Sequence, residues 1–286
     1  MSIYSVAGSV LTGCYGVDGT SKTQAYDVTG EPIFPDAPDL PIPSGNLNAS
    51  ETVMLPDLYE PSKGFTCTGL AYDAENDQFL IGDIGKLLPS SGTIQSQIVR
   101  VTSDFSTVVS IIPVYSTFPS MGDIQGITFD ADGTIWFCAP SENKVHHITT
   151  SGTEIGSFSI TSPTGIAYSP GDDSLWVLNY QNKIQHVSKS GTVVESFDFA
   201  YSEALDQCFL DARRGFLYIT AGTNYSSRNN IYLFNTVTHQ QSITCTVDSY
   251  SVEGLWIGET EMVILNDGYY HSAFVPSNVA NIYTLN

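Results

Sequence analysis

Five copies of one short pattern recur along the chain, and they constrain its fold more than any other feature. In each copy, apolar and polar residues alternate and a small polar residue ends the run, which is the pattern of a half-buried β-strand. The copies are IVRVT (98–102), VHHIT (145–149), IQHVS (184–188), IYLFN (231–235) and IYTLN (282–286). Recurrence of one strand pattern in this way indicates a repeat architecture.

A pair of apolar runs precedes each copy and predicts a β-hairpin. In every pair a polar turn, such as Asp132-Gly133, separates the two runs. The pairs are GLAYDAENDQFLIGD (69–83), GITFDADGTIWFCAP (126–140), GIAYSPGDDSLWVLN (165–179), CFLDARRGFLYITAG (208–222) and GLWIGETEMVILND (254–267). Each repeat therefore contains at least three consecutive strands.

Several conspicuous side chains have a structural explanation in this repeat. Trp136, Trp176 and Tyr218 occupy matching places in the second strands, so we expect them in the core between repeats. His147 and His186 share one third-strand position. Because matching positions of different repeats lie far apart in a ring, we expect these histidines to be framework residues and not ligands of one metal.

A fourth strand follows in the first four repeats but not in the last. The fourth strands are STVVSIIPV (106–114), GTEIGSFSI (152–160), GTVVESFDF (191–199) and QQSITCTV (240–247). Four strands in a unit of roughly forty to fifty residues are typical of a β-propeller blade. A last blade without its outer strand leaves a sheet edge open, and ASETVMLPDL (49–58) belongs to no other repeat. We predict an all-β fold, a five-bladed β-propeller closed by this N-terminal strand in the last blade.

The residues before the propeller contain a smaller repeat and a proline-rich stretch. CYGVDG (14–19) and AYDVTG (25–30) share aromatic, valine and glycine positions, which predicts two small hairpin turns. Five prolines between residues 32 and 43 favour an extended, semi-rigid conformation. We predict a small attachment-like β segment at 1–34, a spacer at 35–45 and the propeller at 46–286.

Composition excludes some partners. The net charge is −20, which repels phosphate backbones, so nucleic acid is not an expected partner. The chain has no apolar stretch long enough to span a bilayer and no signal-peptide pattern at its start, so we expect synthesis in the cytosol without membrane insertion. The five cysteines show no CxxC spacing, which favours buried thiols. The oligomeric state is left open by the sequence.

Polar residues at two positions of each repeat are candidates for a functional site. One position precedes the first strand and the other ends the second strand, and in a propeller both approach the central axis. The first position holds Thr68, Gln125, Thr164, Asp206 and Glu253, and the second holds Asp83, Ala139, Asn179, Ala221 and Asn266, with Asp267 following. Because these residues vary while the framework repeats, they predict a ligand site at one mouth of the axial channel.

The axial oxygens permit two kinds of chemistry. Asp83, Asp206 and Glu253 are candidate catalytic residues, since two converging carboxylates can act as acid and base in glycoside cleavage. These three carboxylates together with Asn179 and Asn266 form an oxygen-rich set that suits Ca²⁺ or another divalent cation. An acidic funnel that holds only water is the alternative. A strongly raised pKa on one of these carboxyls would favour an enzyme, whereas exposed aromatic side chains beside ordinary acids would favour binding.

Two long loops add candidate ligand-binding residues, because binding sites are often built on loops of a rigid scaffold. The loop at 266–281 contains Tyr269, Tyr270 and His271, and the loop at 221–230 contains Tyr225 and Arg228. Together with the axial polar positions, the predicted ligand-binding residues are Gln125, Asn179, Tyr180, Tyr225, Arg228, Asn266, Asp267, Tyr269, Tyr270 and His271.

Two resemblances carry expectations about function. The segment GSVLTGCYGVDGTSKTQAYDVTGEPIF (8–34) resembles short N-terminal segments of phage tail-associated and prophage proteins of gut bacteria. The blades, especially 126–140 and 165–179, look like those of the NHL, SMP-30 and SdiA-regulated propellers, a group that usually has six blades where we count five. The SMP-30 resemblance implies a divalent metal in the funnel, held by carboxylate and Asn ligands, which correspond here to Glu253, Asp206 and Asn179.

The main functional hypothesis is a binding propeller on a virion, a phage tail or a surface, which recognises a host glycan or a partner protein. The alternative is a hydrolase or lyase that cleaves a polysaccharide or an ester with the axial carboxylates, with or without a divalent metal. A third reading is a scaffold that spaces other proteins. No nucleophile elbow, phosphate loop or zinc-protease motif is present to support other chemistries.

Overall fold

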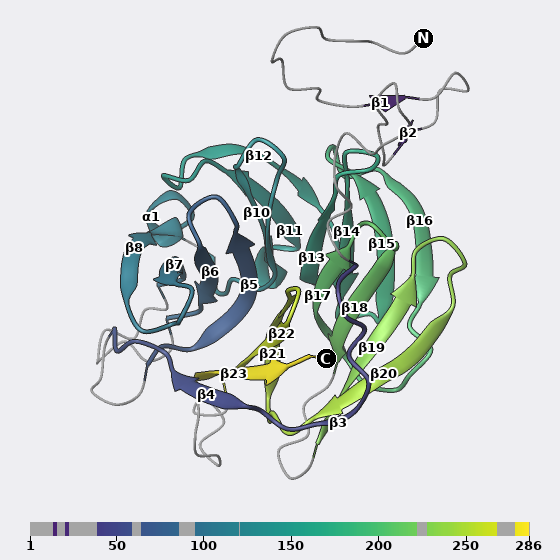
Figure 1. Ribbon diagram of the computed structural model, residues 1–286. Coiled ribbons are helices and arrows are strands. Elements are labelled where there is room, and N and C mark those ends of the chain that lie inside the picture. The colour runs from purple at the N-terminus through teal and green to yellow at the C-terminus, as the bar shows by residue number, and fades with distance from the viewer. Residues whose placement is uncertain are drawn as a thin grey trace, which may run out of the picture. The chain divides into compact units, whose positions relative to one another are not determined.

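The computed structural model describes residues 14–15, 21–22, 39–58, 64–85, 95–119, 121–221, 228–267 and 278–285. They belong to two compact units, Met1–Asp39 and Leu40–Asn286. In the first unit, β1 (Cys14–Tyr15) pairs antiparallel with β2 (Ser21–Lys22). The rest of the two predicted hairpin turns lies outside the described residues. The second unit is the predicted five-bladed β-propeller (Figure 1).

The first three blades are four-stranded antiparallel sheets whose strands follow the chain from the centre outward (Figure 1). Blade one consists of β5 (Cys67–Asp73), β6 (Gln78–Asp83), β7 (Gln97–Thr102) and β8 (Val108–Ile112). Blade two consists of β9 (Ile127–Phe129), β10 (Ile135–Ala139), β11 (Lys144–Ile148) and β12 (Glu154–Ser159). Blade three consists of β13 (Pro163–Ser169), β14 (Ser174–Asn179), β15 (Lys183–Ser188) and β16 (Val193–Asp198).

Blades four and five each include a strand from the N-terminal part of the propeller. Blade four consists of β17 (Leu205–Asp211), β18 (Phe216–Ala221), β19 (Asn229–Asn235), β20 (Gln241–Val247) and β3 (Gly45–Leu47). Blade five consists of β21 (Val252–Ile257), β22 (Glu261–Asn266), β23 (Val279–Thr284) and β4 (Glu51–Met54). The pairing of β4 with β23 confirms the predicted closure of the ring.

The described part of the propeller contains little besides strands. Its helical elements are α1 (Val114–Thr117) and a 3-10 turn at Pro140–Glu142, and neither has the length or the apolar character to cross a membrane. The cysteines of this part lie buried in the sheets as free thiols, namely Cys67, Cys138, Cys208 and Cys245.

Apolar side chains from the facing sheets of neighbouring blades form the cores. Leu80 of blade one and Phe137 of blade two, for example, belong to one buried cluster. Trp136, Trp176 and Tyr218 are 3%, 4% and 0% exposed and lie in three such clusters, which confirms their predicted core position. The alternation of the strands therefore places one face of each sheet against the next blade.

Blades two and three each contain the same side-chain arrangement, which explains why a histidine occurs at this third-strand position in both. His147 pairs across the sheet with Trp136, and the two rings stack at 3.9 Å between centroids. His186 pairs with Trp176 in the same way, at 4.7 Å. A hydroxyl on the second strand lies 2.6 Å from each histidine Nε2, and the two hydroxyls belong to Thr134 and Ser174. These histidines are framework residues, as predicted.

Strand β3 is a feature that the sequence did not predict. It pairs in parallel with β20 and adds a fifth strand to blade four. Contacts to the blade begin earlier in the chain, because Arg214 donates to the carbonyl oxygen of Leu40 and Thr244 Oγ1 donates to that of Pro43. Leu40 also packs against the core that blades four and five share. Residues 40–47 are therefore an edge of the propeller, although the spacer was predicted to extend to residue 45.

Candidate functional site

The polar positions near the axis are set by a β-bulge at the start of the inner strand. In blades one, three, four and five, the register between first and second strands shifts across the same two residues. These pairs are Thr68-Gly69, Thr164-Gly165, Asp206-Gln207 and Glu253-Gly254. A bulge redirects the side chain that it carries, and here it places one polar residue per blade at the same end of the inner strands.

Glycines allow close contact between neighbouring inner strands directly beside these polar residues. A Cβ atom on Gly69 would lie 2.6 Å from the carbonyl oxygen of Gln125, and one on Gly165 would lie 2.7 Å from that of Asp206. The inner strands of neighbouring blades therefore touch backbone to backbone, and the Gly126 amide donates a 2.6 Å hydrogen bond to the Thr164 carbonyl. We call these contacts the glycine waist, which consists of Gly69, Gly126, Gly165 and Gly254 and lies between the two ends of the inner strands.

Gln207 stands where the other blades have this glycine, and its side chain occupies the centre of the waist. Its Nε2 donates to Gln125 Oε1 of blade two at 3.1 Å and to Asp206 Oδ1 at 3.2 Å. The side chain thus reaches past blade three, and it is only 2% exposed. The sequence showed the replacement of glycine, and the structure gives its consequence: a buried amide that joins blade four to blade two.

The predicted carboxylates gather at one end of the channel, which we call the acidic end (Asp206, Glu253, Asp267 and Tyr180). Glu253 and Asp267 are buried, Asp206 is partly buried, and the Asp267 carboxylate accepts a 2.6 Å hydrogen bond from Ser251 Oγ. Half of the Tyr180 side chain is exposed, at 51%, yet burial and then the charges of Asp206, Glu253, Asp123 and Asp267 raise the pKa of its hydroxyl. The sequence prediction that these residues converge is consistent with this grouping.

Asp206 has a strongly shifted acidity. Burial, followed by the charge of Asp267, raises the pKa of the Asp206 carboxyl to about 7, and the hydrogen bond from Gln207 opposes this shift only in part. Two acids that share a poorly solvated site cannot both ionise without cost, so one proton is retained toward neutral pH. At pH 6 this carboxyl can therefore donate a hydrogen bond or a proton.

The substitution Asp206→Asn tests this shift through stability. The ordinary pKa of this group is 3.8, so between pH 4 and pH 7 the folded state holds a proton that the unfolded chain has released. This carboxyl therefore favours folding less and less as the pH rises through that window. We expect Asp206→Asn to stabilise the protein by about 1–3 kcal/mol more at pH 8 than at pH 5, measured by urea unfolding. An equal change at both pH values would contradict the shift.

Two of the predicted site residues have contacts that serve local structure. The Asp83 carboxylate accepts hydrogen bonds of 2.9 Å from the Gly85 amide and from Gln97 Nε2. Asn179 Oδ1 accepts the amides of Gln181 and Lys183 at 3.0 and 3.1 Å, which shapes the turn between β14 and β15. Asn179 is the one of these two residues that belongs to the predicted metal set, and its Oδ1 already accepts two hydrogen bonds. The metal and the catalytic roles stay predictions.

A second group of metal-ligand types lies elsewhere in the described part of the chain. One oxygen or nitrogen atom from each of Asp130, Asp132 and His147 lies within 4.8 Å of the other two. However, Asp130 already accepts hydrogen bonds from Lys189 Nζ at 2.8 Å and from Trp136 Nε1 at 2.7 Å. This group is part of the blade framework and stabilises the β9–β10 turn.

Of the remaining predicted ligand-binding residues, the structure describes Arg228 and Asn266. Arg228 lies at the outer edge of blade four, where it donates to Asn48 Oδ1 at 2.7 Å and to the carbonyl oxygen of Leu47. Asn266 is buried where β22 ends, immediately before Asp267. Tyr225, Tyr269, Tyr270 and His271 lie outside the described residues.

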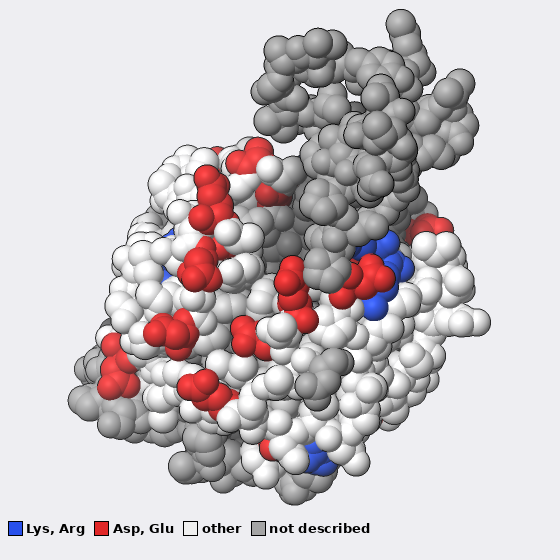
Figure 2. Space-filling view, in the orientation of Figure 1, with Lys and Arg blue, Asp and Glu red and all other residues white. Residues whose placement is uncertain are grey.

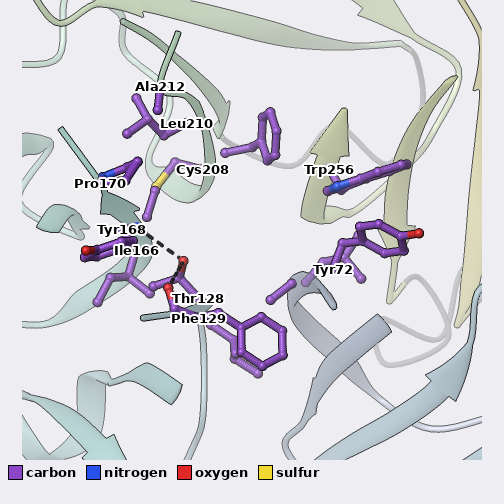
Figure 3. Close-up of a pocket in the computed structure, with 15 residues that line it drawn as sticks. Tyr72, Thr128, Phe129, Ile166, Tyr168, Pro170, Cys208, Leu210, Ala212 and Trp256 are labelled. Carbon is purple, nitrogen blue, oxygen red and sulfur yellow. Dashed lines mark hydrogen bonds between the residues drawn. The ribbon is translucent and has the colours of Figure 1, made fainter. Parts of the chain in front are cut away.

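The other end of the channel contains a cavity that the sequence did not predict. It encloses about 270 Å³ and is lined by the far ends of the inner strands. Figure 3 shows Tyr72, Phe129, Tyr168 and Trp256 around this hollow, and Phe209 completes the lining from blade four. We call these five rings the aromatic cage. Asp206 and Leu210, which line the two ends, are four residues apart on β17, or about 13 Å along the strand.

Acidic residues dominate the visible surface. Figure 2 shows Asp and Glu spread over this face, whereas Lys and Arg are confined to small areas. The chain as a whole has 30 acidic and 10 basic residues. Charge alone therefore favours cationic or neutral polar ligands over anionic ones.

Comparison with known proteins supports the fold. No family model matches the chain. No curated protein matches it. A chain of a nidogen/laminin complex aligns with a TM-score of 0.51 at 16% identity, over 74% of this chain and 75% of its own length. A protein of unknown function from Bacteroides caccae aligns with a TM-score of 0.50 at 13% identity, over 78% and 82%.

The WD40 repeats of RRP9 align with a TM-score of 0.49 at 12% identity, and this chain spans only 63% of their length. Identities this low establish a shared fold and nothing about ligand or activity. The propeller part of the predicted resemblance is therefore supported, and its phage-related part is not addressed by these structures.

Proposed function

We propose that the propeller binds a surface glycan at its acidic end and serves as the recognition module of a virion, phage tail or surface protein. The observation that carries this proposal is the half-exposed ring of Tyr180 beside the carboxyls of Asp206, Glu253 and Asp267. Sugars offer hydroxyl groups that donate and accept hydrogen bonds, and they offer apolar faces that pack on aromatic rings. Carboxylates, amides and a tyrosine ring supply the matching groups.

The raised pKa of the Asp206 carboxyl favours an enzyme by the criterion given above, but a neutral carboxyl also suits the binding of a sugar. A neutral carboxyl donates as well as accepts, whereas an ionised carboxylate only accepts. With a pKa of about 7, Asp206 offers both to a sugar hydroxyl at mildly acidic pH. The assignment to a virion or tail rests on the resemblance of residues 8–34 to phage tail-associated segments.

A panel of immobilised bacterial surface polysaccharides tests the proposal with the full chain at pH 6. We expect retention on at least one glycan, and a loss of apparent affinity of roughly tenfold in Tyr180→Ala. Val194→Ala, an exposed change on the same blade, is the matched control and should bind as the parent protein does. Absence of retention on every glycan, or equal loss in both variants, would contradict the proposal.

One observation favours a second function, cleavage of the bound glycan. The raised pKa of Asp206 is what a general acid requires, and Glu253 and Asp83 are the predicted partner carboxyls. If the propeller is a hydrolase, new reducing ends appear during the same incubation, and Asp206→Asn abolishes them while retention persists. Retention of intact glycan by the parent protein would leave binding as the function.

A further inference from the structure

The aromatic cage at the other end of the channel is a site in its own right. Its five rings come from the five inner strands, and each ring is partly exposed, unlike the fully buried Phe79, Phe137 and Phe234 of the cores between blades. Tyr72 and Trp256 lie side by side at 4.8 Å between centroids, and Figure 3 shows Phe129 and Tyr168 on other sides of the hollow. Aromatic side chains therefore line the cavity on several sides.

The two tyrosine hydroxyls of the cage already donate hydrogen bonds. The Tyr72 hydroxyl donates to Asp77 Oδ1 at 2.8 Å, and the Tyr168 hydroxyl donates to Asp173 Oδ1 at 2.8 Å. Thr128 Oγ1 accepts the Tyr168 amide at 3.2 Å. The other lining residues are mostly aliphatic, as Leu70, Ile127 and Ile166 are. A ligand rich in hydroxyls would lose hydrogen bonds to water here without replacement, so a sugar is a poor occupant.

Carboxylates surround the cage and outnumber its basic groups. The hydrogen bond to Asp77, then burial, and then the charges of Asp77, Glu261 and Asp73 raise the pKa of the Tyr72 hydroxyl. The basic side chains nearby are paired with acids: Arg100 with Asp73, Lys189 with Asp130 and Asp173, and Arg214 with Asp211. The hydrogen bonds to Asp77 and Asp173 also increase the electron density of the two tyrosine rings.

The protein already places one of its own cations on a ring of the cage. Lys189 Nζ lies 4.9 Å from the centroid of Tyr168, where two carboxylates hold it. Aromatic faces attract cations through the ring quadrupole, most strongly where water is excluded. Aromatic walls, engaged hydroxyls and surrounding carboxylates together are the chemistry that recognises a methylated ammonium group.

We propose that the aromatic cage binds the methylated ammonium group of an organic cation of choline size, as a second ligand site independent of the acidic end. The glycine waist lies between the two sites. The proposal therefore does not rest on glycan binding, and the failure of one leaves the other standing.

Calorimetric titration of the full chain with choline and with 3,3-dimethyl-1-butanol tests the proposal, because the alcohol has nearly the same shape without the charge. We expect choline to bind roughly tenfold more tightly than the alcohol, and its methyl proton signals to shift upfield when the rings surround it. Equal affinities would show a purely apolar cavity and overturn the proposal, as would no binding of choline.

Choline affinity in two variants of the cage tests the location of the site, and a third variant tests whether choline binds at the acidic end instead. Trp256→Phe and Phe129→Leu each weaken choline binding several-fold, and the first keeps a ring in the core with Phe79. Asp206→Asn leaves choline affinity unchanged. An equal loss in Asp206→Asn would place the cation at the acidic end and overturn the assignment.

Phosphatidylcholine vesicles test whether the methylated ammonium group belongs to a lipid headgroup or to a soluble cation. Vesicle co-sedimentation that free choline reverses would identify a lipid headgroup. Binding of choline without vesicle retention would identify a soluble cation. Either result supports the cage.

Discussion

Deletion of residues 1–58 is expected to abolish cooperative folding of the propeller, whereas deletion of residues 1–39 leaves it folded. The larger deletion removes β4, which pairs with β23 at four positions, and Leu55, which is 1% exposed. It also removes β3 from blade four. Each buried side chain contributes about 1.5–3 kcal/mol and each ladder hydrogen bond about 1 kcal/mol, so the total approaches the whole stability of a typical domain.

Thermal unfolding followed by circular dichroism measures this difference. The chain that begins at Leu40 retains β3, β4 and the Arg214 contact to Leu40, and we expect its melting temperature to lie within a few degrees of the parent value. If both deletions melt alike, ring closure by β4 is not what holds the blades together.

A single charge in β4 tests the same closure without deletion. Val53 faces the core of blades one and five, whereas the adjacent Met54 is 43% exposed on the other face of the strand. Val53→Asp should destabilise the propeller by about 2–4 kcal/mol, because it places a carboxylate against apolar side chains. Met54→Asp carries the same charge on the same strand and should cost less than about 0.5 kcal/mol.

The repeat made the ring predictable because each blade encodes its own hairpins. Alternating residues and turn residues recur five times, so the strands assigned to one repeat can be checked by comparison with the other four. Closure of the ring by an N-terminal strand was predicted because the last repeat lacks a fourth strand of its own. By contrast, β3 spans only Gly45–Leu47 and has no alternation to detect, and its pairing depends on distant groups such as Arg228. The predicted ligand role of Arg228 came from its loop position, and the structure instead shows it holding this edge.

The acidic end was predictable, but the cage was not. Asp206 and Glu253 stand out because they are polar where the framework repeats glycine and apolar residues. Tyr72, Phe129 and Tyr168 follow the recurring glycine by three residues and are indistinguishable in sequence from core aromatics. Only the meeting of five inner strands shows that these rings line a cavity. Likewise, Gln207 is visible in the sequence as an exception to the glycine pattern. Its hydrogen bond to Gln125 could not be predicted, because it depends on how the ring brings blades four and two together.

The second large effect is expected at the glycine waist. A Cβ atom on Gly69 of β5 would lie 2.6 Å from the Gln125 carbonyl oxygen and 2.7 Å from the Ile127 amide nitrogen, and both are backbone atoms of blade two. Neither blade can yield locally, because backbone contacts join the inner strands around the ring. We therefore expect Gly69→Ala to destabilise the propeller by about 3 kcal/mol or more, at the upper end for overpacked cores.

Gly156→Ala is the matched control for this substitution. Gly156 also lies within a strand, β12 at the outer edge of blade two, and nothing lies within 4 Å of its added Cβ atom. Since alanine loses less backbone freedom on folding than glycine, Gly156→Ala should be neutral or stabilising by up to about 1 kcal/mol. Urea unfolding of the two variants beside the parent protein gives both values. If Gly69→Ala proved as mild as Gly156→Ala, the inner strands could separate without cost. The backbone contacts of the waist would then not hold neighbouring blades at a fixed distance.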